Sequence, residues 1–212
     1  MAESRKRYHG CEVDKEAHWE SVYQSKQDAE VSWTQSDPTL SLSLIREYCE
    51  AGRIIDVGGG TSPLAGRLAD LGYSVAVLDI SQAAIDRARG RLGTRADQIQ
   101  WIVADVTARP GLGTFDVWRD RAVFHFLITP ADRIAYVALL EKTVRPGGIA
   151  IVATFAPDGP ERCSGLDVRR YHGHGLAAEL GSPFNLVKSV PERHVTPSGQ
   201  TQSFQYSVLR RI

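Results

Sequence analysis

The sequence has no excess charge of either sign. It contains 25 Lys+Arg and 25 Asp+Glu, so its formal net charge at pH 7 is zero. A strongly basic surface draws proteins to phosphate backbones and anionic lipids, and zero net charge removes that long-range attraction. We therefore expect no nucleic-acid partner. The short basic run Arg5-Lys6-Arg7 is interpreted as a solvated tail.

Long apolar runs and paired cysteines are also missing. No stretch approaches the roughly 20 apolar residues of a membrane-spanning helix, and none near the start resembles a signal peptide. We therefore predict a cytoplasmic protein with no membrane partner. The cysteines Cys11, Cys49 and Cys163 are widely spaced and form no Cys-x-x-Cys pair. This pattern supports neither a disulfide framework nor a metal site.

Strand-like apolar runs alternate with helical patterns after about residue 50. Five runs are predicted as strands, at 53–57, 74–79, 99–103, 115–118 and 149–155. Helix starts are indicated by Ser62-Pro63, by Ser81 and by the capping pattern that begins at Thr129. Such alternation predicts a Rossmann-like α/β fold, in which a seven-stranded, mainly parallel sheet has helices on both faces.

The C-terminal part has a different pattern. Segments 184–188 and 203–209 are predicted as strands, with prolines and a glycine but no helix between them. They predict an antiparallel pair at one sheet edge. We therefore expect a single domain over 1–212. It consists of a helical N-terminal lid at 1–50, a cofactor-binding core at 51–155, and an acceptor-side loop with the C-terminal strands at 156–212.

The loop Gly58-Gly59-Gly60 follows the first predicted strand directly. Small residues at the carboxyl end of a parallel strand let a ligand approach the backbone closely. Asp79 stands at the end of the second strand. A carboxylate in that position can accept two hydrogen bonds from a ribose diol. Together, the loop and Asp79 predict a nucleoside ligand.

Three details favour a methyl-donor nucleoside over a nicotinamide dinucleotide. The dinucleotide fingerprint needs a small residue at the sixth position from Gly58, where this chain has Pro63. Asp56 suits a cationic sulfonium amino acid better than a pyrophosphate. Asp105, after the third strand, is placed to accept a hydrogen bond from an adenine amino group. A nicotinamide-dependent oxidoreductase remains an alternative.

The ordered series Asp56-x-Gly58-x-Gly60, Asp79, Asp105 and Arg145-Pro146-Gly147-Gly148 resembles the class I S-adenosylmethionine-dependent methyltransferase superfamily. The resemblance covers roughly residues 50–155. It implies that S-adenosyl-L-methionine is the cofactor and S-adenosyl-L-homocysteine the product. Gly58 and Gly60 would then face the methionine part, Asp79 the ribose and Asp105 the adenine. The full set of predicted cofactor contacts is Trp33, Asp56, Gly58, Gly60, Asp79, Ile80, Asp105, Val106 and Asp120.

One position departs from the usual loop of that superfamily. The third glycine is replaced by Ser62, which we interpret as the cap of the helix that follows. Trp33, together with Trp19 and Tyr23, resembles the N-terminal aromatic region that covers the donor in thiopurine-type enzymes. Aromatic faces attract a sulfonium through cation–π interactions, and packing alone would also explain these residues.

The segment after the fourth strand carries the candidate catalytic residues. Asp120-Arg121 resembles the pair found in thiopurine-type S-methyltransferases, whereas some protein-lysine methyltransferases have Asp-Lys-Gly-Thr there. Arg121 is a candidate contact for an anionic acceptor, or else a partner of Asp120 or Asp116. His125, one helical turn further if the segment is helical, is a candidate general base, or else a structural residue.

The sequence therefore predicts a methyltransferase that acts on a small-molecule acceptor at sulfur, nitrogen or oxygen. Methylation of a protein lysine is one alternative, and a non-catalytic nucleoside-binding regulatory module is another. Cys163 lies in a loop that is expected to cover the acceptor, and it has no neighbours at metal-ligand spacing. The sequence makes no prediction about the oligomeric state.

Overall fold

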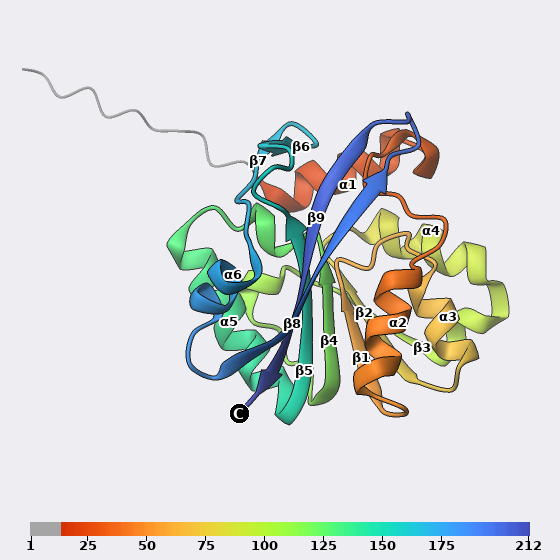
Figure 1. The fold of residues 1–212 in the computed structure, drawn as a ribbon. Helices are drawn as coiled ribbons and strands as arrows, with labels where there is room; N and C mark the ends of the chain where they lie inside the picture. The colour runs from red at the N-terminus through yellow and green to blue at the C-terminus, as the bar shows by residue number, and fades with distance from the viewer. Residues whose placement is uncertain (1–13) are drawn as a thin grey trace, which may run out of the picture.

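A seven-stranded sheet with the strand order β3-β2-β1-β4-β5-β9-β8 forms the centre of the molecule. The structure is a computed structural model that describes residues 14–212 (Figure 1). Arg5-Lys6-Arg7 and Cys11 lie outside the described residues. The strands of this sheet are β1 (Arg53–Val57), β2 (Ser74–Asp79), β3 (Ile99–Val103), β4 (Phe115–Arg121), β5 (Val144–Phe155), β8 (Phe184–Val195) and β9 (Thr201–Arg211).

Helices connect the strands and cover the sheet on both faces. They are α1 (Lys15–Ser25), α2 (Thr39–Tyr48), α3 (Leu64–Asp70), α4 (Gln82–Leu92), α5 (Pro130–Thr143) and α6 (Gly173–Leu180). Short 3-10 turns are η1 (Asp28–Glu30), η2 (Gly93–Gln98), η3 (Val106–Ala108) and η4 (Phe124–Phe126), and a small hairpin joins β6 (Arg162–Cys163) to β7 (Leu166–Asp167).

The topology confirms the predicted fold. Strands β1 to β5 run parallel, and β9 runs antiparallel to both β5 and β8. Alternate residues of each strand enter two separate cores. Ile55 and Val57 face the core formed with α5 and α6, whereas Ile54 faces the core formed with α2, α3 and α4. Both layers are visible in Figure 1, where α5 and α6 lie to the left of the sheet and α2 and α3 to the right.

The predicted helix caps form at Ser81 and Thr129. The Ser81 hydroxyl accepts the Ala84 amide at 3.1 Å, and the Thr129 hydroxyl accepts the Asp132 amide at 3.1 Å. The predicted cap at Ser62 is wrong by one residue, because α3 begins at Leu64 with Pro63 in the N-cap position, although the Ser62 hydroxyl still accepts the Leu64 amide at 3.2 Å. These contacts satisfy amides that have no partner in the first turn of a helix.

Four strands are longer than predicted, and one of them is β9, which was predicted at 203–209 and runs from Thr201 to Arg211. β4 continues to Arg121, so Arg119, Asp120 and Arg121 are strand residues. β5 begins at Val144 and includes Arg145-Pro146-Gly147-Gly148, within an irregular stretch before regular pairing resumes at Ile149. β8 continues through Pro191 to Val195. A proline fits there because β8 is an edge strand, where one side of the backbone has no ladder partner.

Among residues 14–212, no helix is both long and apolar enough to cross a lipid bilayer.

Candidate functional site

A cavity of about 780 Å³, partly open to solvent, lies at the carboxyl ends of the parallel strands. Strands β1 and β2, the segments that follow β3 and β4, and helix α1 all contribute to its wall. The lining residues are Lys15, Trp19, Tyr23, Trp33, Val57, Gly58, Leu78, Asp79, Ile80, Ala104, Asp105, Val106, Arg121, Ala122, Val123, Phe126, Leu127 and Cys163.

The glycine loop forms one wall of the cavity. Residues larger than glycine do not fit in this loop. Gly58 has a φ of +62°, and a Cβ at this position would overlap a methyl group of Val123. Gly60 has a φ of +44°, and its Cβ would lie 2.7 Å from the Tyr23 hydroxyl. Both backbone angles favour glycine. Gly58 lines the cavity, whereas Gly60 lies beside it, against Tyr23 and Asp79.

Asp79 presents a buried carboxyl group to the cavity. Its exposed fraction is 6%, and its Oδ1 accepts the Ser81 amide at 2.9 Å. Burial raises the pKa of Asp79 to about 6, since the charged form loses hydration. A ligand that donates hydrogen bonds to this carboxylate would replace the lost hydration. Ile80, the next residue, also lines the cavity.

Asp105 and Val106 line the cavity next to the end of β3. The Asp105 Oδ1 atom caps η3, because it accepts the Thr107 amide at 2.7 Å and the Thr107 hydroxyl at 2.8 Å. These contacts with Thr107 orient the carboxyl group of a residue that also lines the cavity. Asp105 is therefore placed both to cap the turn and to contact a ligand.

Four aromatic rings form a cluster beside the cavity. Trp19 packs edge-on against Trp33, with ring centroids 5.5 Å apart, and against Phe126 at 5.0 Å. Tyr23 packs edge-on against Trp33 at 6.2 Å. Trp19, Tyr23 and Trp33 were singled out in the sequence, but Phe126 was not. Its position just after a strand that ends at the site is the signal that points to it.

Asp56 does not line the cavity, which corrects its predicted contact with the ligand. Asp56 and Arg119 are register partners on β1 and β4, and the Asp56 Oδ1 atom accepts from Arg119 Nη1 at 2.6 Å. The side chain shares the sheet face of Ile54, two residues before it, because alternate strand residues face the same side. Asp56 is therefore a buried partner of Arg119 beneath the glycine loop.

Asp120 is also directed away from the cavity, which corrects its predicted cofactor contact. Its carboxylate accepts the Val123 amide at 2.9 Å, the Phe124 amide at 3.1 Å and the Tyr136 hydroxyl at 2.7 Å. These three donors lie on the α5 side of the sheet. The carboxylate therefore orients the turn that leads out of β4.

Arg121 ends β4 and lines the cavity. Its Nη1 donates to the Trp33 carbonyl at 3.0 Å, and its Nη2 pairs with Glu192 at 3.4 Å. The guanidinium also lies 4.1 Å from the centre of the Phe204 ring. Its partner is thus neither Asp120 nor Asp116, and Asp116 pairs with Arg145. The tertiary partner Glu192 lies 71 residues away, beyond the reach of sequence reasoning.

His125 is fully buried and does not line the cavity, so its role as a general base stays a prediction without support from the geometry. η4 turns the ring inward, where it packs against Phe126 and Phe155 with ring centroids 4.4 and 4.8 Å away. Its Nδ1 accepts the Phe155 amide at 3.4 Å. Burial lowers the pKa of His125 to about 3, so it is neutral near pH 7. The structural interpretation applies to this residue.

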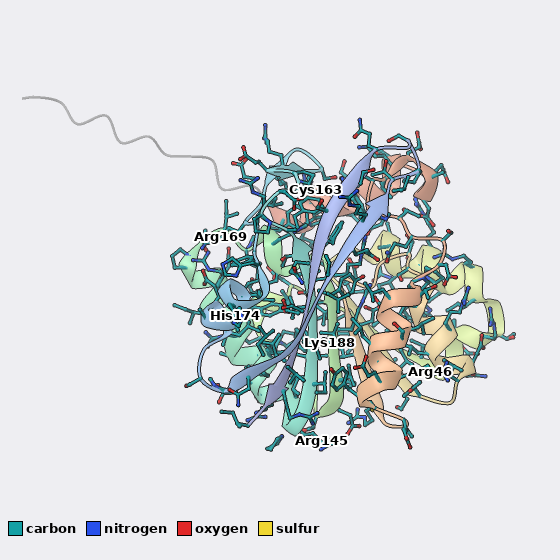
Figure 2. All side chains as sticks on the ribbon, in the orientation of Figure 1. Arg46, Arg145, Cys163, Arg169, His174 and Lys188 are labelled. Atoms are coloured by element: carbon teal, nitrogen blue, oxygen red, sulfur yellow. The ribbon has the colours of Figure 1, made fainter. Side chains whose placement is uncertain are left out.

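Two further residues complete the cavity wall. Cys163 lies at the end of the sheet next to α1 (Figure 2), and burial raises the pKa of its thiol to about 11. Lys15, which the sequence did not single out, pairs with Asp132 at 2.9 Å. Arg145 lies at the opposite end of the molecule (Figure 2). Its Arg-Pro-Gly-Gly motif therefore shapes the start of β5 and does not contact the cavity.

Comparison with known proteins finds similarity to methyltransferases. Residues 54–148 match a family described as a methyltransferase domain. A ubiquinone/menaquinone biosynthesis C-methyltransferase of Paracoccus denitrificans is 32% identical over 108 residues, which cover 49% of this chain and 42% of the relative. Its counterpart in Roseobacter denitrificans is 28% identical over 149 residues, 65% of this chain and 58% of the relative. The chain spans about half the length of these curated relatives.

Solved structures share the fold. A protein from work on the conversion of a disulfide bond into a thioacetal group during echinomycin biosynthesis aligns with a TM-score of 0.75 at 22% identity, over 91% of both chains. The 1,6-didemethyltoxoflavin-N1-methyltransferase of Burkholderia thailandensis aligns with a TM-score of 0.67 at 19% identity, over 90% of this chain and 80% of the other. The chain is thus similar in sequence to methyltransferases over its central part, and it shares the fold of these solved structures.

Proposed function

We propose that this protein is an S-adenosylmethionine-dependent methyltransferase that acts on a small-molecule acceptor. The observation that carries the proposal is the buried carboxylate of Asp79, which faces a cavity bounded by Gly58 and by the aromatic cluster. A ribose diol can donate two hydrogen bonds to such a carboxylate. The glycine loop fits the donor, because a side chain at Gly58 or Gly60 would fill the space beside the ribose.

Different residues of the cavity would hold different parts of the donor. Asp79 would hold the ribose, and Asp105 the adenine amino group. The aromatic faces of Trp19, Tyr23 and Trp33 would attract the sulfonium and exclude water. The donor supplies an activated methyl group, which an acceptor atom attacks in line while the C–S bond breaks and its electron pair stays on sulfur. Positioning the acceptor is therefore the protein's main catalytic contribution.

A small-molecule acceptor is supported by the proteins to which the chain is similar. The matched relatives are named for quinone biosynthesis, and a structural neighbour is named for 1,6-didemethyltoxoflavin, which is also a small molecule. Protein-lysine methylation is the alternative acceptor class, and a non-catalytic nucleoside-binding module is the alternative without chemistry.

Calorimetry with S-adenosylmethionine and S-adenosylhomocysteine tests the donor. We expect binding of both, and at least about tenfold weaker binding in Asp79→Asn, because hydrogen bonds to a charged group contribute about 1.5–3 kcal/mol each. Asp70→Asn is the matched control, since Asp70 is an exposed partner of Arg95 outside the cavity. Binding of NAD with no binding of either donor compound would refute the proposal.

A radiolabelled donor tests the acceptor. The protein is incubated with donor and a cell extract, which is then separated into proteins and small molecules. Label in the small-molecule fraction is the expected result. Label in a discrete protein band would instead assign a protein acceptor. Donor binding with no transfer to either fraction, together with a co-purifying protein, would indicate the regulatory module.

A further inference from the structure

The first residue after β4, Ala122, has a backbone conformation that is unusual for a residue with a side chain. Its φ is +70°, in the left-handed region that favours glycine. Such strain persists only where the surrounding structure holds it, and it concentrates at functional sites. Among residues 14–212, three residues other than glycine have a positive φ, and Ala122 alone of these lines the cavity. The segment that contains Ala122 is therefore a candidate for a role in the reaction.

Residues 122–127, which we call the β4 turn, join the glycine loop to the aromatic cluster. Val123 packs against Gly58, where it leaves no room for a Cβ atom. Phe126 packs edge-on against Trp19 of α1, with ring centroids 5.0 Å apart. Both Val123 and Phe126 line the cavity. A displacement of the β4 turn would therefore change the spacing between the glycine loop and the lid.

The carboxylate of Asp120 fixes the start of the β4 turn. Its Oδ1 atom accepts the Val123 amide at 2.9 Å, and its Oδ2 atom accepts the Phe124 amide at 3.1 Å. The Ala122 amide donates to the Ala153 carbonyl of β5 at 2.9 Å. The exposed fraction of Asp120 is 0%, so bulk water does not compete for its carboxylate. Three consecutive amides are thus held, and these contacts keep Ala122 in its strained conformation.

Tyr136 of α5 in turn orients the carboxylate of Asp120. Its hydroxyl donates to the Asp120 Oδ2 atom at 2.7 Å and accepts from the Trp118 Nε1 atom at 2.8 Å. Its ring packs edge-on against Phe124, with centroids 4.8 Å apart. All four side chains are fully buried, and none of them lines the cavity. They therefore act on the β4 turn from the α5 side of the sheet.

We propose that Asp120 and Tyr136 are positioning residues for methyl transfer, which act through the β4 turn. The inference rests on the proposed function, because it takes the donor to lie between the glycine loop and the lid. The acceptor atom must stand in line with the C–S bond, and a misplacement of about 1 Å can slow such a reaction by about 100-fold. Asp79 and Asp105, assigned to the nucleoside, come from β2 and from the segment after β3. The β4 turn should therefore control the rate of transfer more than the affinity for the donor.

Tyr136→Phe removes the hydroxyl that orients Asp120 and keeps the ring. The rate of label transfer is measured with radiolabelled S-adenosylmethionine and a fixed amount of one cell extract as the source of acceptor. We expect the rate at saturating donor to fall by at least about tenfold, and the KM for S-adenosylmethionine to change by less than about twofold. Calorimetry with S-adenosylhomocysteine should give an unchanged affinity, which also shows that the variant is folded. Asp120→Asn should lower the rate further, because its amide group cannot accept from all three donors.

Tyr73→Phe is the matched control for Tyr136→Phe. The Tyr73 hydroxyl donates to the Cys49 carbonyl at 2.7 Å, the same length as the bond from Tyr136 to Asp120. Tyr73 is buried in the core on the other face of the sheet and does not line the cavity. Both variants should lower the unfolding temperature, but Tyr73→Phe should leave the rate of transfer unchanged. Equal losses of rate in the two variants would mean that Tyr136 acts through general stability, and would overturn the proposal.

The outcomes distinguish this inference from the proposed function. If the unmodified protein binds no S-adenosylhomocysteine, the proposed function fails, and this inference fails with it. If the unmodified protein transfers label and both Tyr136→Phe and Asp120→Asn do so at the same rate, only the positioning role is wrong. A raised KM for S-adenosylmethionine at an unchanged limiting rate would assign the β4 turn to donor binding, and would also overturn the proposal. If Asp120→Asn is unfolded, Tyr136→Phe decides the test alone.

Discussion

At the residue scale, three buried carboxylates differ in what they face. Asp56, Asp79 and Asp120 all stand near the carboxyl ends of neighbouring strands. Asp56 is held by Arg119, and Asp120 accepts from two amides and a tyrosine. Asp79 alone of the three lines the cavity. The strand face that each residue occupies therefore decides which carboxylate can meet a ligand.

The raised pKa of Asp79 predicts a pH-dependent affinity for the donor. A ribose diol donates to the ionised carboxylate, and burial raises the pKa of Asp79 to about 6. Affinity for S-adenosylhomocysteine should therefore be constant above pH 7 and weaken as the pH falls through 6, by about tenfold per unit below it. Calorimetry between pH 5 and pH 8 measures this, at pH values where the protein remains folded.

Asp79→Asn is the control for that pH dependence. The amide does not titrate, so the profile of this variant should be flat between pH 5 and pH 8. Burial also raises the pKa of Asp120 to about 6, but Asp120 does not line the cavity and is unchanged in the variant. If Asp79→Asn keeps the full pH dependence of donor affinity, a group other than Asp79 causes that dependence.

The raised pKa of Asp79 also affects the stability of the ligand-free protein. Its contribution to stability falls as the pH rises, whereas affinity for the donor is expected to fall as the pH decreases. The folded-state pKa of Asp79 lies above the ordinary value of 3.8, so the folded protein binds this proton more tightly than the unfolded chain. The contribution of Asp79 to stability is therefore fully present below pH 3.8 and is lost as the pH rises through 6. Buried His125 contributes in the opposite sense, because its pKa is lowered to about 3.

At the scale of elements, the N-terminal segment is held over the cavity by parts of the chain distant in sequence. Arg121 of β4 donates to the Trp33 carbonyl, and His194 of β8 contacts the Ser32 carbonyl at 2.7 Å. The β8–β9 hairpin extends past the end of the central strands toward α1 (Figure 1). β4 and β8 thus hold the predicted lid in place through these two contacts.

Removal of one lid ring should weaken donor binding. Trp19→Ala deletes edge-on contacts with Trp33 and Phe126, and aromatic pairs contribute roughly 0.5–1.5 kcal/mol each beyond their buried area. We expect affinity for S-adenosylmethionine to fall by about 5- to 100-fold. Titration followed by calorimetry measures the change.

Trp101→Ala is the matched control for the lid. Trp101 is a half-buried residue of β3 whose Nε1 donates to the Ala96 carbonyl, and it does not line the cavity. This variant should lower the unfolding temperature and leave donor affinity unchanged. Equal losses of affinity in both variants would mean that Trp19 acts through general stability and is not part of the ligand site.

At the scale of the whole molecule, the C-terminal strands are joined to the parallel strands β1 to β5 by one continuous sheet. β9 lies between β5 and β8, and Leu209 and Val208 of β9 enter the two different cores. Each core therefore combines residues of the parallel strands with residues of β9. This arrangement supports the proposal of a single domain over residues 1–212.

A single domain should unfold in one cooperative transition. We expect urea curves followed by far-ultraviolet circular dichroism and by tryptophan fluorescence to coincide, because Trp118 is buried where the sheet meets α5. S-adenosylhomocysteine should shift both curves equally to higher urea, since binding to the folded state stabilises it. Two midpoints at different urea concentrations would instead show that the chain contains independently folding parts.

Local signals account for the features that were predicted correctly. Ser81 and Thr129 cap their helices through contacts within three residues, and the glycine loop requires positive φ angles that glycine adopts without strain. The alternation of strands and helices predicted the sheet and its antiparallel edge pair. Strand ends were less accurate, because Pro191 normally interrupts a strand and only the edge position of β8 accommodates it.

The roles of individual side chains required the tertiary structure. Spacing alone placed Asp56, Asp120 and His125 near the site, but side chains on successive strand residues face opposite sides, and the turn after β4 buries the histidine. The ion pairs of Arg119 and Arg121 join residues 63 and 71 positions apart. Short-range chemistry specifies loops, caps and strand order along the chain, whereas the partner of a buried charge depends on which segments the fold brings together.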